Sequence, residues 1–341
     1  MKSRCKTLFK VGLFVTIILV LGGAAVMAAS HTPVDWQGRY RSTGMKDIKV
    51  TVAALKSTLS DPNENLKHVE TACKIAQKDG ARLVLLPECM LTGHGGHRPT
   101  MEKNAEPVPE GPLSQAVLKM SQQYQLCICV GIGERADGVI YNSVMVADKG
   151  KFLGVQRKIY LSSDEPRFFA EGQKVEVFDI NDVRFGISIC YDNLFPEIAM
   201  IHKLHDVDLI LAAHAARVDD WPDVLTPEFC AKKIKAEQER HQKMYAGTAY
   251  FYNIYILSTN AVGSATEGIK GVVSNHEGGV LGVDPNGGVI LRTSAKDSFI
   301  EEVRTVELKA SGRKFNHHPT RNRDYMRLKA LLDKEFKEAG Y

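Results

Sequence analysis

The sequence has almost no excess of charge of either sign. Its 341 residues contain 44 lysines and arginines and 40 aspartates and glutamates, which gives a formal net charge of +4 at pH 7. Proteins that bind nucleic acid or another strongly charged partner usually carry a basic excess or blocks of like charge. The chain also lacks a residue-level repeat. These absences argue against a repeat protein and give no indication of a nucleic-acid partner.

Long apolar runs are absent except near the N-terminus. The first ten residues carry four basic side chains, residues 11–21 are almost wholly apolar, and residues 22–30 are rich in glycine and alanine. This pattern is typical of a secretory signal peptide, and Val26-Met27-Ala28 fits a cleavage signal. The alternative is an uncleaved anchor, because the apolar stretch approaches the ~20 residues that span a bilayer. We therefore expect an exported protein (periplasmic or extracellular), or one that residues 1–30 tether to a membrane.

Cysteine is scarce, at seven residues, and no CxxC pair occurs. Without such a pair, a thiol redox protein is not indicated. Cleavage after residue 30 would leave six cysteines, a number that suggests disulfides in an exported chain. Their spacing argues against this, because Cys127 and Cys129 would point to the same face of one strand. Cys73 occupies an apolar helix position. Most of the cysteines are therefore expected to lie unpaired in the core.

The rest of the composition is that of an ordinary globular protein, with 44% hydrophobic and 25% charged residues. Apolar runs of strand length alternate with helical spacing early in the chain and with hairpins later. This order predicts a mixed sheet system covered by helices, an α/β or α+β layered domain. Residues 46–310 should form one domain, preceded by a linker at 31–45 and followed by a tail with an amphipathic helix at 311–341. Strands are expected at 48–55, 83–86, 126–132, 140–147, 152–156, 175–180, 183–189, 209–212, 254–258, 280–283, 289–291 and 299–306, and helices from Asp61, at 113–124, 198–204 and 227–249, and from Thr320.

Three ionisable groups stand at the ends of apolar, strand-like runs. Glu88 follows LVLLP, Lys158 follows FLGVQR and Cys190 follows FGISI. Strand ends on one side of a sheet converge, so these groups are expected to meet. In such a site the carboxylate takes the thiol proton, the thiolate attacks an amide or nitrile carbon, and the lysine stabilises the negative oxygen that forms. The alternative is that Cys190 is a buried small hydrophobe, as most free cysteines are.

The same segments resemble the nitrilase superfamily, the carbon–nitrogen hydrolases, over residues 46–310. The resemblance rests on LVLLPECMLTG around Glu88, YNSVMVADKGKFLGVQRKIYL around Lys158 and GISICYDNLFPE around Cys190, and it continues in ILSTNAVG and GGVLGVDPNGGV. The three catalytic motifs stand in the family's order and at its usual intervals. The resemblance implies a four-layer α-β-β-α sandwich. It also implies pairing through helices into a homodimer or higher homo-oligomer, with 198–204 and 227–249 as interface candidates.

The resemblance also implies roles for single residues. The family's general base, its stabiliser of the intermediate and its nucleophile map onto Glu88, Lys158 and Cys190. A second glutamate that positions substrate and lysine matches Glu165 in EPRFFAEG, with Glu171 as the alternative, although most glutamates are simply solvated. Backbone amides near the nucleophile, such as that of Tyr191, would complete an oxyanion pocket. The family needs no cofactor and no metal.

Two histidines depart from the family pattern. The family often has an aromatic residue after the Thr-Gly that follows the base, and here His94 stands in that place, within GHGGH. His94 and His97 would line the pocket, chelate a metal or remain plain surface residues. His214 lies in AAHAARVDDW, where the family often has a proline and then a pocket-lining residue. Together with Tyr191, His94 and His214 are therefore the candidates for substrate binding.

The residues after the nucleophile indicate the reaction. Cys-Tyr-Asp is more similar to amidases and carbamoyl hydrolases than to true nitrilases, which have Cys-Trp-Glu. We therefore expect hydrolysis of a linear, non-peptide amide or N-carbamoyl bond through a Cys190 thioester, with ammonia or an amine as leaving group. The alternatives are nitrile hydrolysis by the same triad, N-acyl transfer, and non-catalytic binding on the same fold. The acyl-transferring membrane branch has several spanning helices, and a binding protein has little reason to keep all three triad residues.

Overall fold

The computed structural model describes residues 45–180, 183–218, 227–267, 269, 274–293, 300–310 and 323–339. The signal segment or anchor predicted at 1–30 lies outside these ranges, as does the predicted linker up to its last residue, Met45. Among the described helices, none combines the length and the apolar character that crossing a bilayer requires.

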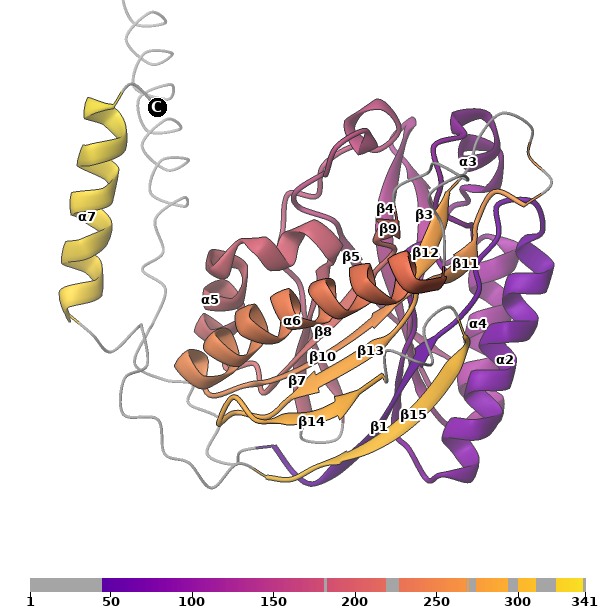
Figure 1. Ribbon diagram of the computed structural model, residues 1–341, viewed down its shortest axis with the longest axis horizontal. Coiled ribbons are helices and arrows are strands. Elements are labelled where there is room, and N and C mark those ends of the chain that lie inside the picture. The colour runs from indigo at the N-terminus through magenta and orange to yellow at the C-terminus, as the bar shows by residue number, and fades with distance from the viewer. Residues whose placement is uncertain are drawn as a thin grey trace, which may run out of the picture. The chain divides into compact units, whose positions relative to one another are not determined.

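Six strands form the first sheet: β1 (Ile48–Ala54), β2 (Leu83–Leu85), β3 (Cys127–Ala136), β4 (Val139–Asp148), β5 (Lys151–Arg157) and β15 (Glu302–Leu308). Their spatial order is β15-β1-β2-β3-β4-β5 (Figure 1). The neighbours β1, β2 and β3 run parallel, and the remaining pairs are antiparallel. Because β3, β4 and β5 form a meander, β5 runs in the direction of β2 and ends at the same edge of the sheet.

A second sheet also has six strands: β6 (Val177–Ile180), β7 (Val183–Ile189), β8 (Leu209–His214), β10 (Tyr255–Asn260), β13 (Val280–Val283) and β14 (Val289–Arg292). Their spatial order is β14-β13-β10-β8-β7-β6, and β7, β8 and β10 are parallel. A small antiparallel sheet joins β9 (Arg217–Val218), β11 (Val262–Ser264) and β12 (Asn275–Glu277).

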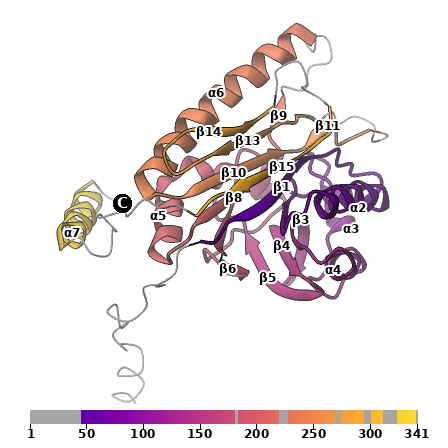
Figure 2. The ribbon, with the colours of Figure 1, turned by 90° about the horizontal axis from the view of Figure 1, so that it is seen from below.

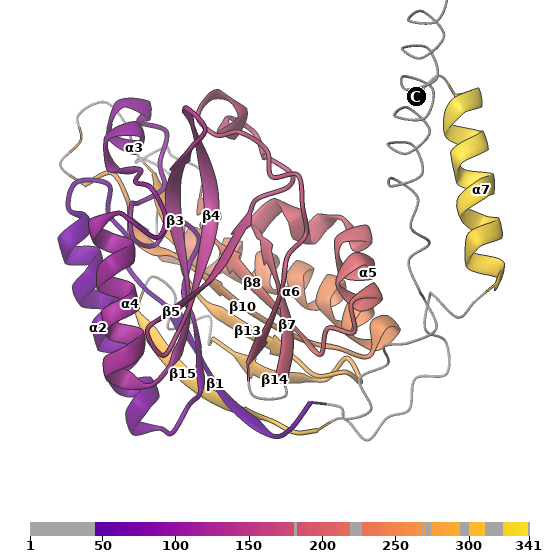
Figure 3. The same cartoon turned by 180° about the vertical axis from the view of Figure 1, so that it is seen from behind.

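Helices cover the outer faces of the two large sheets: α2 (Pro62–Lys78) and α4 (Pro112–Tyr124) on the first, α5 (Pro196–Leu204) and α6 (Pro227–Tyr252) on the second (Figure 2). The inner faces pack on each other, and the apolar cluster between them combines β1 residues such as Val50 with β7 residues such as Phe185. Figure 3 shows β3, β4 and β5 in front of β8 and β10. The predicted four-layer α-β-β-α sandwich is confirmed.

Local sequence signals account for the helix boundaries. The Asp61 carboxylate accepts hydrogen bonds from the backbone N–H groups of Asn63 and Glu64, both at 3.1 Å, and Pro62 occupies the first turn of α2. These are the usual N-terminal features of a helix. Gly80, at φ +72°, follows the end of the helix. The tail helix expected from Thr320 is α7 (Arg323–Glu338), whose Leu331, Leu332 and Phe336 are exposed.

The structure differs from the sequence-based expectation in short or polar segments. Helix α3 (Arg98–Asn104) and the three-stranded sheet were not expected, because they are too short to show a hydrophobic period. The last strand runs over 302–308 instead of 299–306. The turn expected at Asn181-Asp182 lies outside the described residues, although the flanking strands β6 and β7 pair as predicted.

A buried histidine packs α5 onto the second sheet. His202 is fully buried, and Gly186 of β7 makes room for its ring, because a Cβ at that glycine would lie 2.1 Å from His202 Nδ1. Burial lowers the pKa of His202 from 6.5 to about 4. The folded protein therefore keeps this imidazole neutral in a pH range in which the unfolded chain is already protonated.

This histidine should make folding sensitive to acid. Its contribution to stability is complete above pH 6.5 and is lost as the pH falls towards 4, by about 3 kcal/mol in total. His202→Leu keeps the ring site apolar and cannot titrate. Free energies of unfolding in urea, measured for both proteins from neutral pH to pH 4, should shift in favour of the variant by that amount. Other titrating groups cancel in the difference, so a constant difference over this range would contradict the prediction.

Candidate active site

The three groups at strand ends come from both sheets. Glu88 lies three residues after the end of β2, and Lys158 directly follows β5, at the same edge of the first sheet. Cys190 directly follows β7 of the second sheet. The sequence had suggested one sheet edge. The site is instead assembled where the edges of two stacked sheets come together, with Glu165 added by a short 3₁₀ helix, η1 (Glu165–Arg167).

The loop that carries Glu88 lies directly on the neighbouring strand. Gly131 of β3 donates its N–H to the Pro87 carbonyl at 3.1 Å, and its own carbonyl accepts from Leu91 N–H at 2.9 Å. A Cβ at Gly131 would stand 2.2 Å from the backbone nitrogen of Cys89. Only glycine permits so close an approach. Cys89 itself has φ +47°, and the Glu88 carboxylate beside this turn bonds both Lys158 after β5 and the Ala215 N–H after β8.

The nucleophile candidate begins a tight turn. Cys190 has φ +46°, a conformation that is uncommon outside glycine and frequent at functional sites, and it opens the 3₁₀ helix η2 (Cys190–Leu194). The Asp192 carboxylate accepts from Ile189 N–H at 3.1 Å, from Tyr160 N–H at 2.8 Å and from Ile159 N–H at 3.1 Å. This one side chain therefore connects the Cys190 turn to the segment after Lys158. Burial raises the pKa of Asp192 to about 6 despite these bonds.

A buried ion cluster forms the centre of the site. Lys158 Nζ lies 2.8 Å from Glu88 Oε1 and 2.9 and 2.7 Å from the two oxygens of Glu165. All three side chains are 1% exposed. The Asn142 amide of β4 donates to Glu88 Oε1 at 2.6 Å and to Glu165 Oε1 at 2.9 Å. Burial alone would lower the pKa of Lys158, but the neighbouring carboxylates outweigh it and hold the pKa well above its usual value.

The two carboxylates differ in their partners. Besides Lys158 and Asn142, Glu165 accepts from the backbone N–H and the hydroxyl of Ser162, each at 2.8 Å, and it lies 3.2 Å from His94 Nε2. Burial would raise the pKa of Glu165, yet His94 and Lys158 hold it well below the usual range. Glu88 has one further donor, Ala215 N–H at 2.6 Å. Glu165 is therefore a fixed anion, whereas fewer donors bond the Glu88 carboxylate.

The thiol of Cys190 rests in its protonated form. Burial raises its pKa well above the usual range, and the nearby charge of Glu88 raises it further. The Lys158 ammonium and the Ala215 backbone N–H act in the opposite direction without cancelling the rise. Cys190 thus needs a base to become a nucleophile.

Other sequence candidates lie in different places. Glu171 is exposed, so its position fits the second-glutamate role less well than that of Glu165. His97 Nδ1 lies 2.8 Å from the Thr100 hydroxyl, on the first turn of α3. The ring of Tyr191 meets Phe195 edge-on, with ring centroids 5.3 Å apart. Its backbone N–H, the group expected to complete an oxyanion pocket, lies in the η2 turn.

His214 does not take the expected orientation. Side chains alternate along a strand, and Ala213 faces the core between the sheets, so the ring of His214 faces the helix layer. There its Nε2 lies 2.7 Å from the hydroxyl of Tyr245 on α6. The expected contact of the His214 side chain with substrate therefore stays a prediction, and the contact that the ring makes is with Tyr245. The main chain of His214 helps to hold the Glu88 loop in place, because its carbonyl accepts a hydrogen bond from Glu88 N–H at 3.3 Å.

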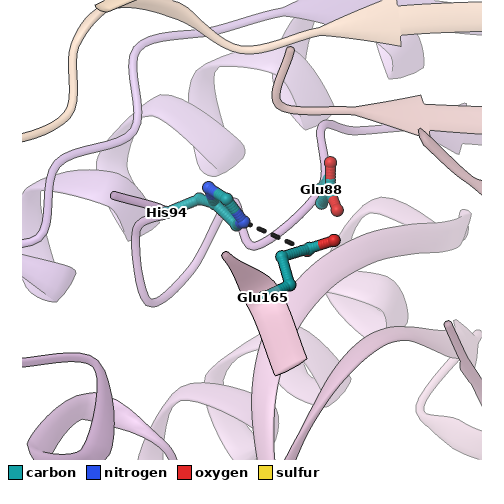
Figure 4. Close-up of side chains that lie close together, drawn as sticks. All are labelled: Glu88, His94 and Glu165. Carbon is teal, nitrogen blue, oxygen red and sulfur yellow. Dashed lines mark hydrogen bonds and ion pairs between the residues drawn. The ribbon is translucent and has the colours of Figure 1, made fainter. Parts of the chain in front are cut away.

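Figure 4 shows Glu88, His94 and Glu165 converging, with His94 pointing at Glu165. One ligand-type atom from each of the three lies within 4.8 Å of the others, close enough to hold a metal ion. The Lys158 ammonium, however, bonds both carboxylates. A metal ion would have to displace it, so the arrangement is better explained by a lysine than by a metal.

The matching family model identifies the chain. The model for carbon–nitrogen hydrolases covers residues 49–311. The chain belongs to the carbon–nitrogen hydrolase family. It is 33% identical to a nitrilase of Pyrococcus abyssi over 173 residues, 50% of this chain and 65% of that protein. It is 28% identical to the N-carbamoylputrescine amidase of Solanum lycopersicum over 175 residues, 48% of this chain and 58% of that protein.

The chain spans less than two thirds of the length of the first curated relatives that it matches. Among solved structures, Saccharomyces cerevisiae Nit3, a nitrilase-superfamily member, matches with a TM-score of 0.63 at 20% identity, over 77% of this chain and 90% of that one. A mutant of the Nesterenkonia AN1 amidase matches with a TM-score of 0.62 at 17% identity, over 87% and 98%. At such identities these likenesses show the fold, which is the nitrilase fold.

The candidate site also contains residues that the sequence patterns did not indicate. Asn142 lies in the YNS of the lysine motif and Asp192 in the CYD of the cysteine motif, so both were inside quoted segments. Ser162 and the Ala215 backbone N–H act through short-range contacts to the two glutamates, which no spacing rule reveals.

Proposed function

We propose that this carbon–nitrogen hydrolase cleaves linear, non-peptide amide or N-carbamoyl bonds through a thioester on Cys190. The observation that carries the proposal is the buried cluster, in which one lysine is held between two glutamates of unequal hydrogen bonding. It supplies a base, a fixed cation and a fixed anion beside a protonated thiol. No cofactor enters any step.

Glu88 acts as the general base. Its carboxylate takes the proton of the Cys190 thiol as the sulfur attacks the carbonyl carbon, so an S–C bond forms and the C=O π bond opens. Glu165 is unsuited to this step, since its five donor groups keep it ionised.

Lys158 stabilises the tetrahedral intermediate. Its ammonium is already oriented by Glu88 and Glu165, so little reorganisation is needed when negative charge develops on the substrate oxygen. The backbone N–H of Tyr191 is proposed as a second donor to that oxygen.

Glu88 also completes the cycle. It returns the proton to the departing nitrogen, and the C–N bond breaks to release ammonia or an amine and leave the thioester. The free carboxylate then takes a proton from water as the oxygen attacks the thioester. Cys190 leaves with that proton, and the product acid is released.

The proposal that the substrates are amides and not nitriles rests on fewer observations than the proposed catalytic roles do. It rests on the similarity of Cys190-Tyr191-Asp192 to amidases and carbamoyl hydrolases, whereas the relatives named above include both a nitrilase and a carbamoyl amidase. Nitrile hydrolysis by the same triad is the second candidate. N-acyl transfer and binding without turnover are the others.

A panel of substrates tests the proposal. Ammonia release by the purified protein should be measured with short aliphatic amides, N-carbamoyl amines and amino acids, and nitriles of matched chain length. Release from amides or carbamoyl compounds supports the proposal and identifies the class. Release from nitriles alone would keep the triad and overturn the class. A folded protein that releases nothing would favour acyl transfer or binding.

Export and pairing remain proposals of the same kind. We propose that residues 1–30 export the protein or anchor it, which mass spectrometry of its N-terminus would test.

We also propose a homo-oligomer built through α5 and α6. Tyr250 and Phe251 near the end of α6 are 55% and 63% exposed, which supports an interface there. Sedimentation velocity would measure the assembly.

A further inference from the structure

His94 reaches the ion cluster because its loop folds back on itself. After Glu88, Gly93 N–H bonds the Cys89 carbonyl at 2.8 Å, and Gly93 has φ +78°. A Cβ at this position would also lie 2.7 Å from the backbone nitrogen of Leu59. Both the positive φ and this close contact therefore require glycine. The same loop therefore brings Glu88 to Lys158 from one direction and His94 to Glu165 from another (Figure 4).

The ring of His94 is held on several sides. It is 7% exposed, and it stacks on Phe169 with ring centroids 6.3 Å apart and an interplanar angle of 27°. The ring of His276 on β12 meets it edge-on at 6.3 Å, and His276 Nε2 lies 3.1 Å from the His94 carbonyl. A ring packed in this way has little freedom to follow a substrate, but it offers a fixed donor to Glu165.

The carboxylate determines which nitrogen carries hydrogen. Glu165 is ionised and can only accept, so His94 Nε2, at 3.2 Å, must be the donor. His94 Nδ1 is buried and has no hydrogen-bond partner in the described part of the chain. A hydrogen on Nε2 therefore satisfies the contact with Glu165.

Other charged groups surround this pair. Asp164 directly precedes η1, and its carboxylate is paired with Arg217 of β9 at 2.6 Å. From β12 the facing group is His276, which burial keeps neutral by lowering its pKa to about 4. Lys158 reaches the cluster from β5 and bonds Glu165 directly. None of these groups replaces the donor that His94 directs at Glu165 Oε1.

We propose that His94 is a positioning residue that orients Glu165, and through it the Lys158 ammonium, for the reaction. The inference rests on the proposed function. It replaces the expectation that His94 contacts substrate, and it gives this chain an extra donor at a position where the resembled family often has an aromatic ring. Without that donor Glu165 would draw Lys158 more strongly to itself, which would weaken the positive potential at Cys190.

Two variants separate the donor from the ring. His94→Phe keeps a ring on Phe169 but removes the donor. His94→Gln places its amide nitrogen where Nε2 stands and so keeps the donor. With the best substrate of the panel, His94→Phe should lower kcat about tenfold with KM changed less than about twofold, since the lost bond is to a charged group. His94→Gln should stay within about threefold of the wild type.

A second readout does not need turnover. The rate of Cys190 alkylation by iodoacetamide, followed by mass spectrometry of its peptide, reports the thiolate as the pH is varied. Its midpoint should move to higher pH in His94→Phe and stay in place in His94→Gln. If the wild type releases no ammonia but this shift occurs, the proposed function fails and the positioning role stands.

Three results would overturn the inference. A rise in KM with unchanged kcat would make His94 a substrate contact. Loss of thermal stability in His94→Phe with unchanged kcat and unchanged alkylation profile would make it a packing residue only. Equal effects of His94→Phe and His94→Gln would show that the donor to Glu165 does not matter.

Discussion

Replacing Cys190 with alanine is expected to lower ammonia release by roughly 10⁴-fold or more, because the reaction loses its nucleophile. The neighbouring Cys89 cannot take over. It is fully buried, burial raises the pKa of its thiol well above the usual range, and its S–H donates to the side-chain Oδ1 of Asn142 at 3.4 Å. The ion cluster does not depend on the thiol, so thermal unfolding should stay close to that of the wild type. Both quantities are measured on the same preparations.

Cys73→Ala is the matched control. It removes another buried thiol, from the face of α2 that packs on the first sheet. This variant should lose a little stability and keep full turnover. If Cys190→Ala still released ammonia at a rate near that of the wild type, the thioester route would be wrong.

Replacing Lys158 with methionine should damage both activity and folding. The variant leaves Glu88 and Glu165 buried without a counter-charge, and removing one partner of a buried ion pair costs about 3–5 kcal/mol. Turnover should disappear because the intermediate loses its stabilising cation. Urea unfolding at neutral pH measures the first effect and ammonia release the second.

Two comparisons make this result specific. Lys174→Met breaks an exposed pair with Glu176 at 2.9 Å and should change stability by less than about 1 kcal/mol. Adding Glu165→Gln to Lys158→Met removes one of the stranded charges and should restore part of the lost stability. Equal, small losses for Lys158→Met and Lys174→Met would mean that the buried carboxylates are not both ionised in the folded protein.

The layered fold follows from patterns that the sequence displays clearly. Apolar runs such as 183–189 and helices with a capped start such as α2 have periods and boundary residues that local physics dictates. The pairing of strands across the two sheets has no such local signal. Glu88 and Cys190 could be assigned to strand ends, but only the packing of one sheet on the other shows that these ends belong to different sheets.

The residues of the site could be predicted where they stand in motifs. The directions in which their side chains point could not. The positions of Glu88, Lys158 and Glu165 in one cluster agree with the motif-based interpretation, although their catalytic roles remain proposals. His214 shows the limit. The sequence placed it just after a strand that ends at residue 212, whereas it is the last residue of β8. Strand alternation turns its ring to α6, and its carbonyl accepts a hydrogen bond from Glu88 N–H. The contact of His94 with substrate stays a prediction. Its contact with Glu165 could not be predicted, because spacing does not show where a loop folds back.

The division of the site between two sheets gives turnover a diagnostic value. The base and the cation come from one sheet and the sulfur from the other, so neither half has the chemistry alone. A refolding chain whose sheets had formed without packing together would show its full circular dichroism and no catalysis. The rate at which ammonia release recovers during refolding therefore reports the rate at which the two sheets pack together. A variant with a loosened apolar layer between the sheets would show reduced turnover before it showed a loss of secondary structure.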